Sequence, residues 1–154
     1  MMLVTETADR IKRMEIRGAG RIARAAAESL RDHAQLLAVQ DIGAFKADIL
    51  KAAGLLVATR PTAVSLPNAV HIVLAGLDGA KTVNEARDGV IRQANAFIGS
   101  SIHAVGKIAQ IGARHIRDGD TILTHCNSEA ALACIIEAHR SGCLLYTSPS
   151  PRDS

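Results

Sequence analysis

Apolar residues recur at helical spacing from about residue 5 to residue 116, and no other feature constrains the fold of this chain as strongly. They are almost all aliphatic, because Phe45 and Phe97 are the only aromatic residues in that stretch. The periodicity and its breaks predict successive helices at residues 5–16, 20–38, 41–59, 67–77 and from residue 83 to about 111. The sequence therefore predicts an all-helical domain with an aliphatic core over residues 1–117.

Local signals mark where the later helices begin. A proline at position 61 forces Arg60 out of helical geometry and so separates two helices. Thr82, with Glu85 three residues on, has the spacing of a capping box and predicts the start of the last long helix. Glycines that allow a break or a close helix contact lie within that helix, at Gly99, Gly106 and Gly112.

The helical periodicity of the sequence ends before residue 118. Residues 117–120 carry a turn signal, and the β-rich run at residues 121–124 predicts a strand. Ser128 then has the character of an N-cap for a following helix. A strand followed by a helix is the first βα unit of a Rossmann-like α/β domain with a parallel sheet, which we place at residues 118–142. Because one strand cannot form a sheet, that domain is predicted to be incomplete, and the fold class is α + α/β.

A cysteine lies where the predicted strand meets the predicted helix. Backbone N–H groups at a helix start carry partial positive charge, so they can hold a phosphate and favour the thiolate of Cys126. A cysteine and an anion site in one turn indicate an enzyme that acts on a phosphorylated small molecule. The alternative is a small buried thiol at the end of a strand, since cysteine is often a core residue. Cys134, on the following helix, is predicted to be a core residue.

The segment at residues 143–154 breaks with everything before it. It contains the single tyrosine and two of the four prolines, and it interrupts a helical pattern. It also resembles the conceptual translation of a transposon-end sequencing adapter. We therefore expect residues 143–154 to be a library artefact, exclude them from fold reasoning, and expect the natural protein to continue past Gly142. The alternative is a genuine disordered tail rich in serine and proline.

The formal net charge is +3, a mild excess that suits an anionic substrate without requiring one. The basic residues are dispersed, and no aromatic residues alternate with them, which argues against nucleic-acid binding. Cys126 and Cys134 lack the spacing of metal ligands, and the histidines are scattered, so no metal or other cofactor is expected. We find no disulfide pattern, no signal peptide and no apolar run of membrane-spanning length, and therefore expect a cytoplasmic protein.

Two short motifs place arginine at breaks between predicted helices. Residues 17–21 (RGAGR) precede a helix start, where glycines let the backbone approach a ligand and N–H groups can meet an anion. Arg17 can add a charge-assisted contact with a phosphate. Arg60 is presented from a break instead of from a helix face. Taken singly, each motif has a plainer interpretation: a structural link between helices in the first case, and a turn in the second.

Taken together, the motifs RGAG, RPTAV and THCNS, in this order, resemble the archaeal ribose 1,5-bisphosphate isomerases. The resemblance covers nearly all of residues 5–142. That family groups with the methylthioribose-1-phosphate isomerases and the regulatory subunits of translation initiation factor 2B. Residues 14–23 and 65–70 are the most specific parts. They favour the bisphosphate isomerases, because Gly20 stands where the methylthioribose enzymes usually have proline.

The resemblance implies an isomerisation of α-ribose 1,5-bisphosphate to ribulose 1,5-bisphosphate, a step in the degradation of nucleoside monophosphates. It implies that Cys126 transfers a proton together with an aspartate from a later segment, and that the protein forms a dimer or larger homo-oligomer. The substrate-binding residues that it implies are Arg17, Gly18, Ala19, Gly20, Arg60, Ser128, Glu129 and Ala130. The three residues from Ser128 to Ala130 coincide with the predicted helix start, so the two lines of reasoning agree there.

The chain also departs from the pattern of that family. No aspartate here matches the second catalytic residue, because Asp118 and Asp120 precede the predicted strand; at ~3.3 Å per residue, Asp120 would lie roughly 20 Å from Cys126. His125 would point to the opposite face of the strand and is not expected to partner the cysteine. We therefore expect this chain by itself to be inactive. A non-catalytic initiation-factor-2B-type regulatory subunit and a methylthioribose-1-phosphate isomerase remain the alternatives.

Overall fold

The computed structural model describes residues 1–125 and 128–143, and every regular element in these residues is helical. The elements are α1 (Met2–Lys12), α2 (Ala19–Leu36), α3 (Ile42–Val57), α4 (Ser65–Leu74), the 3₁₀ turn η1 (Ala75–Leu77), α5 (Val83–Ala113) and α6 (Glu129–Arg140). The chain divides into two compact units, Met1–Ile102 and His103–Ser154, and α5 runs from the first into the second. The expected domain boundary at residue 117 stays a prediction.

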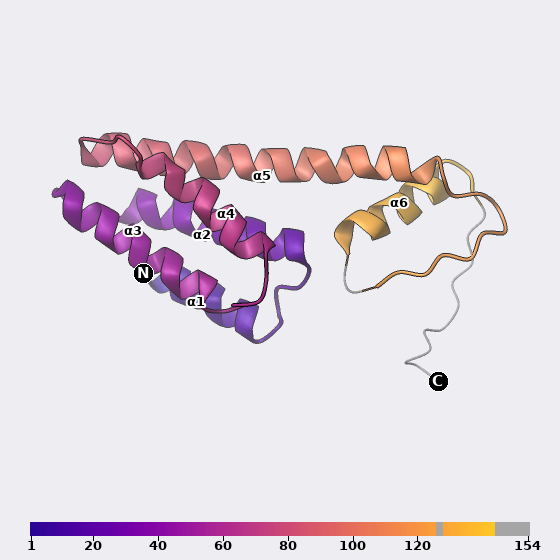
Figure 1. Ribbon diagram of the computed structural model, residues 1–154, viewed down its shortest axis with the longest axis horizontal. Coiled ribbons are helices and arrows are strands. Elements are labelled where there is room, and N and C mark those ends of the chain that lie inside the picture. The colour runs from indigo at the N-terminus through magenta and orange to yellow at the C-terminus, as the bar shows by residue number, and fades with distance from the viewer. Residues whose placement is uncertain (126–127, 144–154) are drawn as a thin grey trace. The chain divides into compact units, whose positions relative to one another are not determined.

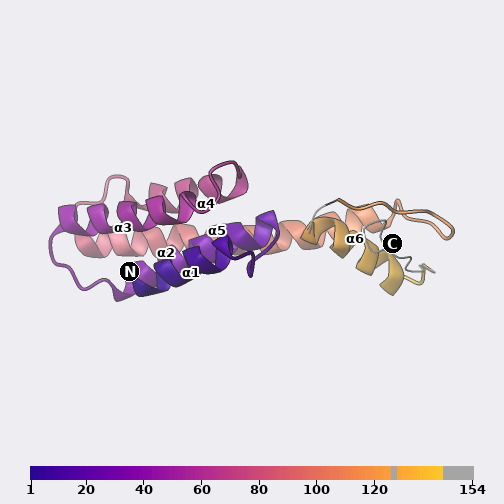
Figure 2. The ribbon, with the colours of Figure 1, turned by 90° about the horizontal axis from the view of Figure 1, so that it is seen from below.

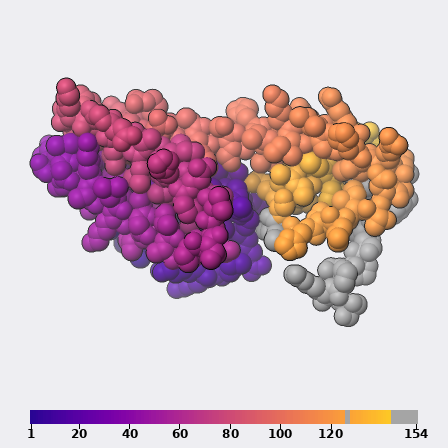
Figure 3. All heavy atoms as spheres, in the orientation of Figure 1, coloured from indigo at the N-terminus to yellow at the C-terminus, as the bar shows by residue number. Residues whose placement is uncertain are grey.

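The first unit is the predicted aliphatic bundle. Helix α2 contacts α1, α3 and α4, and the N-terminal turns of α5 complete the bundle (Figures 1 and 2). Half of the buried residues of α2 are alanines, so the neighbouring helices can approach this helix closely. These alanines are Ala23, Ala26, Ala27 and Ala34. The largest fully buried side chains are Phe45, Ile11, Leu30, Ile49, Leu56 and Leu66, each stabilising the fold by about 1.5–3 kcal/mol. The side chains of α3 and α4 meet on the face shown in Figure 3.

The predicted helices are found, with shifted ends. Helix α1 stops at Lys12, earlier than the expected residue 16, because the chain turns at Met14, whose φ is +60°. The N–H of Met14 donates to the Ile11 carbonyl (3.1 Å) and the N–H of Glu15 donates to the Arg10 carbonyl (3.0 Å). This pair of bonds is a Schellman motif, the common way to satisfy the last carbonyls of a helix.

The starts of α4 and α5 follow local chemistry. Helix α4 begins at Ser65, before the expected residue 67, because Pro67 falls in the first turn, where its missing N–H removes no helical bond. The capping box before α5 is confirmed: the Glu85 N–H donates to the Thr82 hydroxyl (3.2 Å). The Glu85 carboxylate accepts a bond from the Lys81 N–H (2.8 Å). None of the helices in the part of the chain that the structure describes is both long and apolar enough to cross a membrane.

A buried histidine links α2 to α3. His33 is 4% exposed, and its Nε2 lies 2.5 Å from Oδ1 of Asp48. Arg87 on α5 contacts the same C-terminal end of α2, since it donates to the carbonyls of Ala34 (3.1 Å) and Leu37 (3.0 Å). These polar contacts join helices that are distant in sequence, so helical periodicity could not reveal them.

The second unit consists of the last turns of α5, a connecting segment and α6. Gly112 provides the close helix contact that the sequence allowed: a Cβ placed on it would lie 2.4 Å from Sγ of Cys134. Cys134 is half-buried, and its thiol donates to the Ile108 carbonyl (3.4 Å). Gly99 and Gly106 have no such neighbour within 4 Å, and α5 continues through both without a break.

The predicted strand is not formed. Residues 121–125 are irregular and exposed, so the expected βα unit reduces to its helix. The physical reason is that a strand is stabilised by ladder hydrogen bonds, and no other segment among residues 1–125 and 128–143 supplies a neighbouring strand. The helical half of the prediction is confirmed, because the Ser128 hydroxyl accepts a bond from the Ala131 N–H (3.3 Å) and caps α6.

The C-terminal end of α6 also has a defined stop. Gly142 adopts a φ of +97°, its N–H donates to the His139 carbonyl (3.0 Å), and the Cys143 N–H donates to the Ala138 carbonyl (3.1 Å). These bonds form a second Schellman motif. The helix therefore ends before residue 143 and is not interrupted by it, contrary to the expectation from the sequence. Residues 144–154 of the expected artefact lie outside the described residues.

Candidate functional site

The segment RGAG lies between α1 and α2 and forms the start of α2. Gly18 is the N-cap and adopts φ +88° with ψ +132°, a conformation that only glycine occupies without strain. No side chain caps this helix start. The backbone N–H groups of Ala19, Gly20 and Arg21 have no hydrogen-bond partner among the residues that the structure describes. An uncapped helix start with aligned N–H groups is a site at which an anion can bind.

The two arginine motifs meet at Met14. Arg17 donates from Nε to the Met14 carbonyl (2.6 Å), and a terminal guanidinium nitrogen of Arg60 lies 3.1 Å from the Met14 sulfur. We call Met14, Arg17 and Arg60 the arginine cluster. Arg17 is exposed and Arg60 is half-buried, so both guanidinium groups are accessible to a ligand. The structure thus brings together two motifs that are more than 40 residues apart.

A further contact joins the segments that carry the cluster. The hydroxyl of Ser65, the first residue of α4, donates to the carbonyl of Ala19 (3.2 Å), the first residue of α2. The acidic residue nearest the cluster in sequence, Glu15, lies 3.6 Å from Nε of Arg10. Because Glu15 is paired with Arg10, its carboxylate does not neutralise Arg17 or Arg60, and both guanidinium groups can bind another anion. The arrangement suits a phosphate group.

The remaining candidate residues belong to the second unit. Ser128 caps α6, and Glu129 and Ala130 form its first turn, as predicted. Glu129 is half-buried, like Ala130, while Ser128 is exposed. Cys126, the candidate catalytic residue, lies outside the described residues together with Asn127. The structure therefore groups Arg17, Gly18, Ala19, Gly20 and Arg60 in the first unit, and Ser128, Glu129 and Ala130 in the second.

Another cysteine has an altered acidity. A hydrogen bond with the Asp118 side chain, aided by burial and by the negative charges of Asp118 and Asp120, raises the pKa of the Cys143 thiol. A raised pKa keeps the group as a thiol and so lowers its reactivity.

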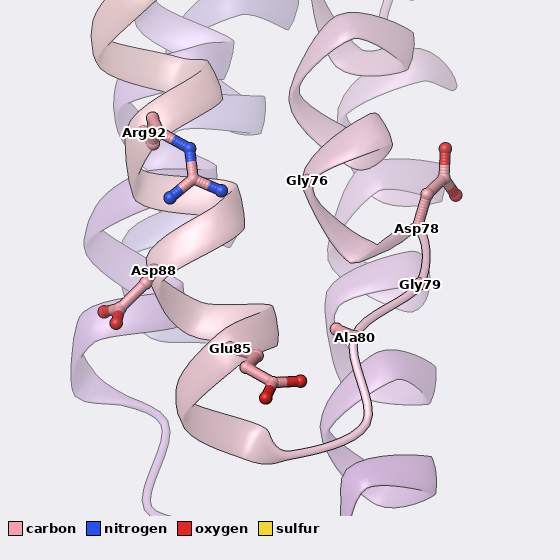
Figure 4. Close-up of a pocket in the computed structure, with 7 residues that line it drawn as sticks. All are labelled: Gly76, Asp78, Gly79, Ala80, Glu85, Asp88 and Arg92. Atoms are coloured by element: carbon pink, nitrogen blue, oxygen red, sulfur yellow. The ribbon is translucent and has the colours of Figure 1, made fainter.

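A hollow of about 320 Å³ lies between η1 and α5 (Figure 4), and its lining residues include none of the arginine cluster. Asp78, Glu85, Asp88 and Arg92 are among its lining residues. The carboxylates do not converge, because Asp88 points away from Glu85 and Asp78 points away from α5 (Figure 4). The Glu85 carboxylate is also engaged in the helix cap. Within residues 1–125 and 128–143, no group of three or more His, Cys, Asp or Glu side chains could hold a metal ion.

Comparison with protein families gives a match over most of the chain. Residues 15–147 match the sequence profile of the initiation factor 2 subunit family. The matched stretch begins just before the RGAG segment and extends past Gly142. It therefore includes the arginine cluster residues Arg17 and Arg60 and the start of α6.

Curated relatives carry names of sugar-phosphate isomerases. The chain is 47% identical to the ribose 1,5-bisphosphate isomerase of Methanocaldococcus jannaschii, over 92% of this chain and 45% of that protein. It is 48% identical to the protein of the same name from Haloterrigena turkmenica, over 90% of this chain and 42% of that protein. A putative methylthioribose-1-phosphate isomerase of Archaeoglobus fulgidus is 32% identical, over 81% of this chain and 37% of that protein. The chain thus spans about half the length of the curated relatives it matches.

Solved structures have the same helical arrangement. The 5-methylthioribose 1-phosphate isomerase of Pyrococcus horikoshii superposes with a TM-score of 0.79 at 28% identity, over 92% of this chain and 42% of that one. Subunit delta of translation initiation factor eIF-2B from A. fulgidus superposes with a TM-score of 0.74 at 30% identity, over 91% of this chain and 44% of that one. Fold similarity therefore extends both to a protein named as an isomerase and to a protein named as a translation factor.

Proposed function

The chain belongs to the initiation factor 2 subunit family, and we propose that it forms the N-terminal half of an isomerase that converts α-ribose 1,5-bisphosphate to ribulose 1,5-bisphosphate. The observation that carries this proposal is the arginine cluster beside the uncapped start of α2. It combines the permanent charges of Arg17 and Arg60 with backbone N–H donors, the two elements that recognise a phosphate.

The relatives support the choice of substrate. Sequence identity is 47% to a protein named ribose 1,5-bisphosphate isomerase and 32% to one named for methylthioribose 1-phosphate. Gly20 supports the same choice. It is the second residue of α2 and keeps its backbone N–H, whereas a proline at this position would have no N–H to offer a phosphate.

The reaction moves a proton from C2 of the sugar to C1 as the ring opens. We propose that Arg17 and Arg60, together with the backbone of Gly18, Ala19 and Gly20, hold a phosphate of the substrate. Ser128, Glu129 and Ala130 are further proposed substrate-binding residues. Cys126 is proposed as the group that transfers the proton, because a cysteine with a tuned pKa exchanges protons near neutral pH. Its aspartate partner is proposed to come from a segment beyond this chain, in the second half of such an enzyme.

We also propose a pathway, a cellular compartment and an oligomeric state for the whole protein. A step that makes ribulose 1,5-bisphosphate from a ribose phosphate belongs to the degradation of nucleoside monophosphates, and we propose a cytoplasmic homo-oligomer for the whole protein. A Rossmann-like second domain is part of the same proposal. Residues 121–124 would find in that domain the ladder partners that residues 1–125 and 128–143 do not provide.

A regulatory subunit without turnover is the second candidate. It is favoured by the structural similarity to eIF-2B subunit delta, which has a TM-score of 0.74 against 0.79 for the isomerase but a slightly higher sequence identity, 30% against 28%. Such a protein would bind a nucleotide or a sugar phosphate at the same helix start. It would have no need for Cys126, and this difference allows the two candidates to be separated.

A hybrid protein tests the activity. Residues 1–142 are joined to the matching C-terminal half of the M. jannaschii relative, and turnover of ribose 1,5-bisphosphate and of methylthioribose 1-phosphate is measured. We expect turnover of the bisphosphate, loss of that turnover in Cys126→Ser, and no turnover by the 154-residue chain alone. Arg92→Ala is the control, because Arg92 is an exposed arginine outside the cluster.

Three outcomes would contradict the proposal. A hybrid that melts cooperatively and yet isomerises neither sugar favours the regulatory subunit. Preference for methylthioribose 1-phosphate would reassign the substrate, and full activity of Cys126→Ser would remove the role of the cysteine. If the hybrid does not fold, titration of the 154-residue chain with ribose 1,5-bisphosphate, followed by NMR, decides whether the arginine cluster binds the sugar at all.

A further inference from the structure

Met14 occupies a backbone position that normally belongs to glycine. It is the C′ residue of the Schellman motif that ends α1, and its φ is +60°. Among the described residues it is the one non-glycine residue with a positive φ. A side chain in this left-handed region brings Cβ close to the following carbonyl oxygen and costs about 1–2 kcal/mol relative to glycine. Ending the helix therefore does not explain a methionine here.

Core packing does not explain it either, because the Met14 side chain is 44% exposed. What the residue does supply is two contacts. Its carbonyl oxygen accepts the bond from Nε of Arg17 at 2.6 Å, and its sulfur accepts the contact from a terminal guanidinium nitrogen of Arg60 at 3.1 Å. A strained position that persists at the meeting point of two functional groups points to a role in that function.

We propose that Met14 is a positioning residue for the sugar-bisphosphate site, holding Arg17 and Arg60 in place before the substrate arrives. This inference rests on the proposed function. Each guanidinium has five N–H donors. Each guanidinium contacts Met14 through one of its nitrogens. The other guanidinium nitrogens of both arginines have no partner within residues 1–125 and 128–143. Those donors are available to a phosphate, and fixing the side chains in advance reduces the entropy lost on binding.

The left-handed backbone also determines where the carbonyl points. With φ at +60°, the chain reverses after α1, so that residue 17 follows within one turn and its Nε reaches the Met14 carbonyl. Arg60 comes from the break between α3 and α4, and the thioether is the group that meets it. The backbone of Met14 therefore serves one arginine and its side chain serves the other, which makes the two roles separable by substitution.

Two variants separate positioning from stability. Met14→Gly removes the thioether and relieves the backbone strain, so we expect its melting temperature to rise by roughly 2–4 °C. Met14→Ala removes the same thioether but keeps a Cβ in the left-handed region, so we expect no such rise. If Met14 positions Arg60, both variants should raise the Kd for ribose 1,5-bisphosphate by roughly three- to tenfold, because both lose the contact. Binding and stability then change independently.

The measurement is an NMR titration of the ¹⁵N-labelled 154-residue chain with ribose 1,5-bisphosphate, in which the Nε–H resonances of the arginines are followed. Ribose 5-phosphate and inorganic phosphate are the comparison ligands. In Met14→Gly the Arg60 resonance should shift while that of Arg17 stays in place, since the carbonyl is retained. In an Arg60→Ala background, Met14→Gly should leave the Kd unchanged, because the residue through which it acts is gone.

The outcomes distinguish this inference from the function on which it rests. If Arg17→Ala and Arg60→Ala bind the bisphosphate as well as the unchanged chain does, or if that chain does not bind it, both proposals fail. If the arginine variants lose more than tenfold in affinity but both Met14 variants keep the original Kd, the site stands and the role of Met14 is overturned. A Kd that follows the melting temperature across the Met14 variants would likewise show a purely structural role.

Discussion

The backbones of Gly76 and Gly89 are in direct contact. A Cβ placed on Gly89 would lie 2.0 Å from the carbonyl oxygen of Gly76, and one placed on Gly76 would lie 2.4 Å from the carbonyl carbon of Gly89. Gly76 belongs to η1 and Gly89 to α5, so this contact sets how closely the first turns of α5 approach the end of α4. Only hydrogen atoms on both Cα positions permit that approach.

Gly89→Ala is therefore expected to destabilise the first unit. The added methyl group meets backbone atoms, which cannot rotate away, and overpacking of this kind costs about 1–3 kcal/mol. Urea unfolding followed by circular dichroism measures the effect. Gly54→Ala is the control: Gly54 lies within α3 with no neighbour within 4 Å, and alanine should raise stability by up to about 1 kcal/mol. Equal stability of both variants would contradict the contact.

Arg87 is expected to contribute more stability than other surface arginines. Its guanidinium donates to the carbonyls of Ala34 and Leu37 just where α2 ends, and it lies 5.6 Å from the centroid of the Phe45 ring. Arg87→Met should lower the free energy of unfolding by about 1–3 kcal/mol, because it leaves two partly buried carbonyls without a donor. Arg87→Lys should recover a minor part of this stability, since an ammonium lacks the planar fork of donors with which the guanidinium bonds both carbonyls over the Phe45 ring.

The matched control for Arg87 lies on the same helix. Arg92 is exposed and has no hydrogen-bond partner in the described part of the chain, so Arg92→Met should change stability by no more than about 0.5 kcal/mol. If the two substitutions had the same effect, the carbonyl contacts of Arg87 would not be significant for stability.

The two glycines of RGAG should respond differently to alanine. Gly18 has a φ of +88°, so Gly18→Ala should cost about 1–3 kcal/mol through backbone strain and displace the start of α2. Gly20 lies inside α2, where alanine is favoured, and Gly20→Ala should not lower the melting temperature. Thermal melts give the stability of each variant. A Gly18→Ala protein as stable as the parent would show that the conformation of Gly18 is not required.

The N-cap of α6 gives a test confined to the second unit. Ser128→Ala removes the acceptor for the Ala131 N–H and should cost about 1 kcal/mol of helix stability. Hydrogen exchange of the amides of α6 should become faster, while exchange in the first unit stays the same. Asp41→Ala, which removes the bond from the Ala44 N–H (2.7 Å) at the cap of α3, should have its effect in the first unit instead. Faster exchange throughout the chain in either variant would mean that the two units unfold together.

Local signals in the sequence predicted the helices and several of their ends. Ser128, Thr82 and Glu85 act as caps because their hydrogen bonds reach only a few residues along the chain. The strand expected at residues 121–124 is not formed, because the propensity of these residues for extended structure has no effect without a neighbouring strand, and residues 1–125 and 128–143 provide none. The end of α1 was missed because the Schellman motif places methionine where glycine is the usual signal.

The candidate site shows the same division. The sequence identified Arg17 and Arg60 as separate motifs and related them through a family resemblance, but neither spacing nor composition indicated that they share Met14 as a contact. The contact of Ser65 with Ala19 also joins segments that are distant in sequence. Pattern analysis cannot find such pairs, because they depend on how α1, α2 and the break before α4 are packed.

The sequence by itself determined what depends on neighbouring residues: an all-helical first unit, an aliphatic core and the caps at Thr82 and Ser128. Helical periodicity and capping act within one or two turns, so a single chain segment carries the whole signal. Tertiary structure alone decided the close contact of Gly76 with Gly89, the burial of His33 beside Asp48 and the meeting of two arginines at Met14. These features require helices to pack in a definite arrangement, and packing is set by the whole core at once.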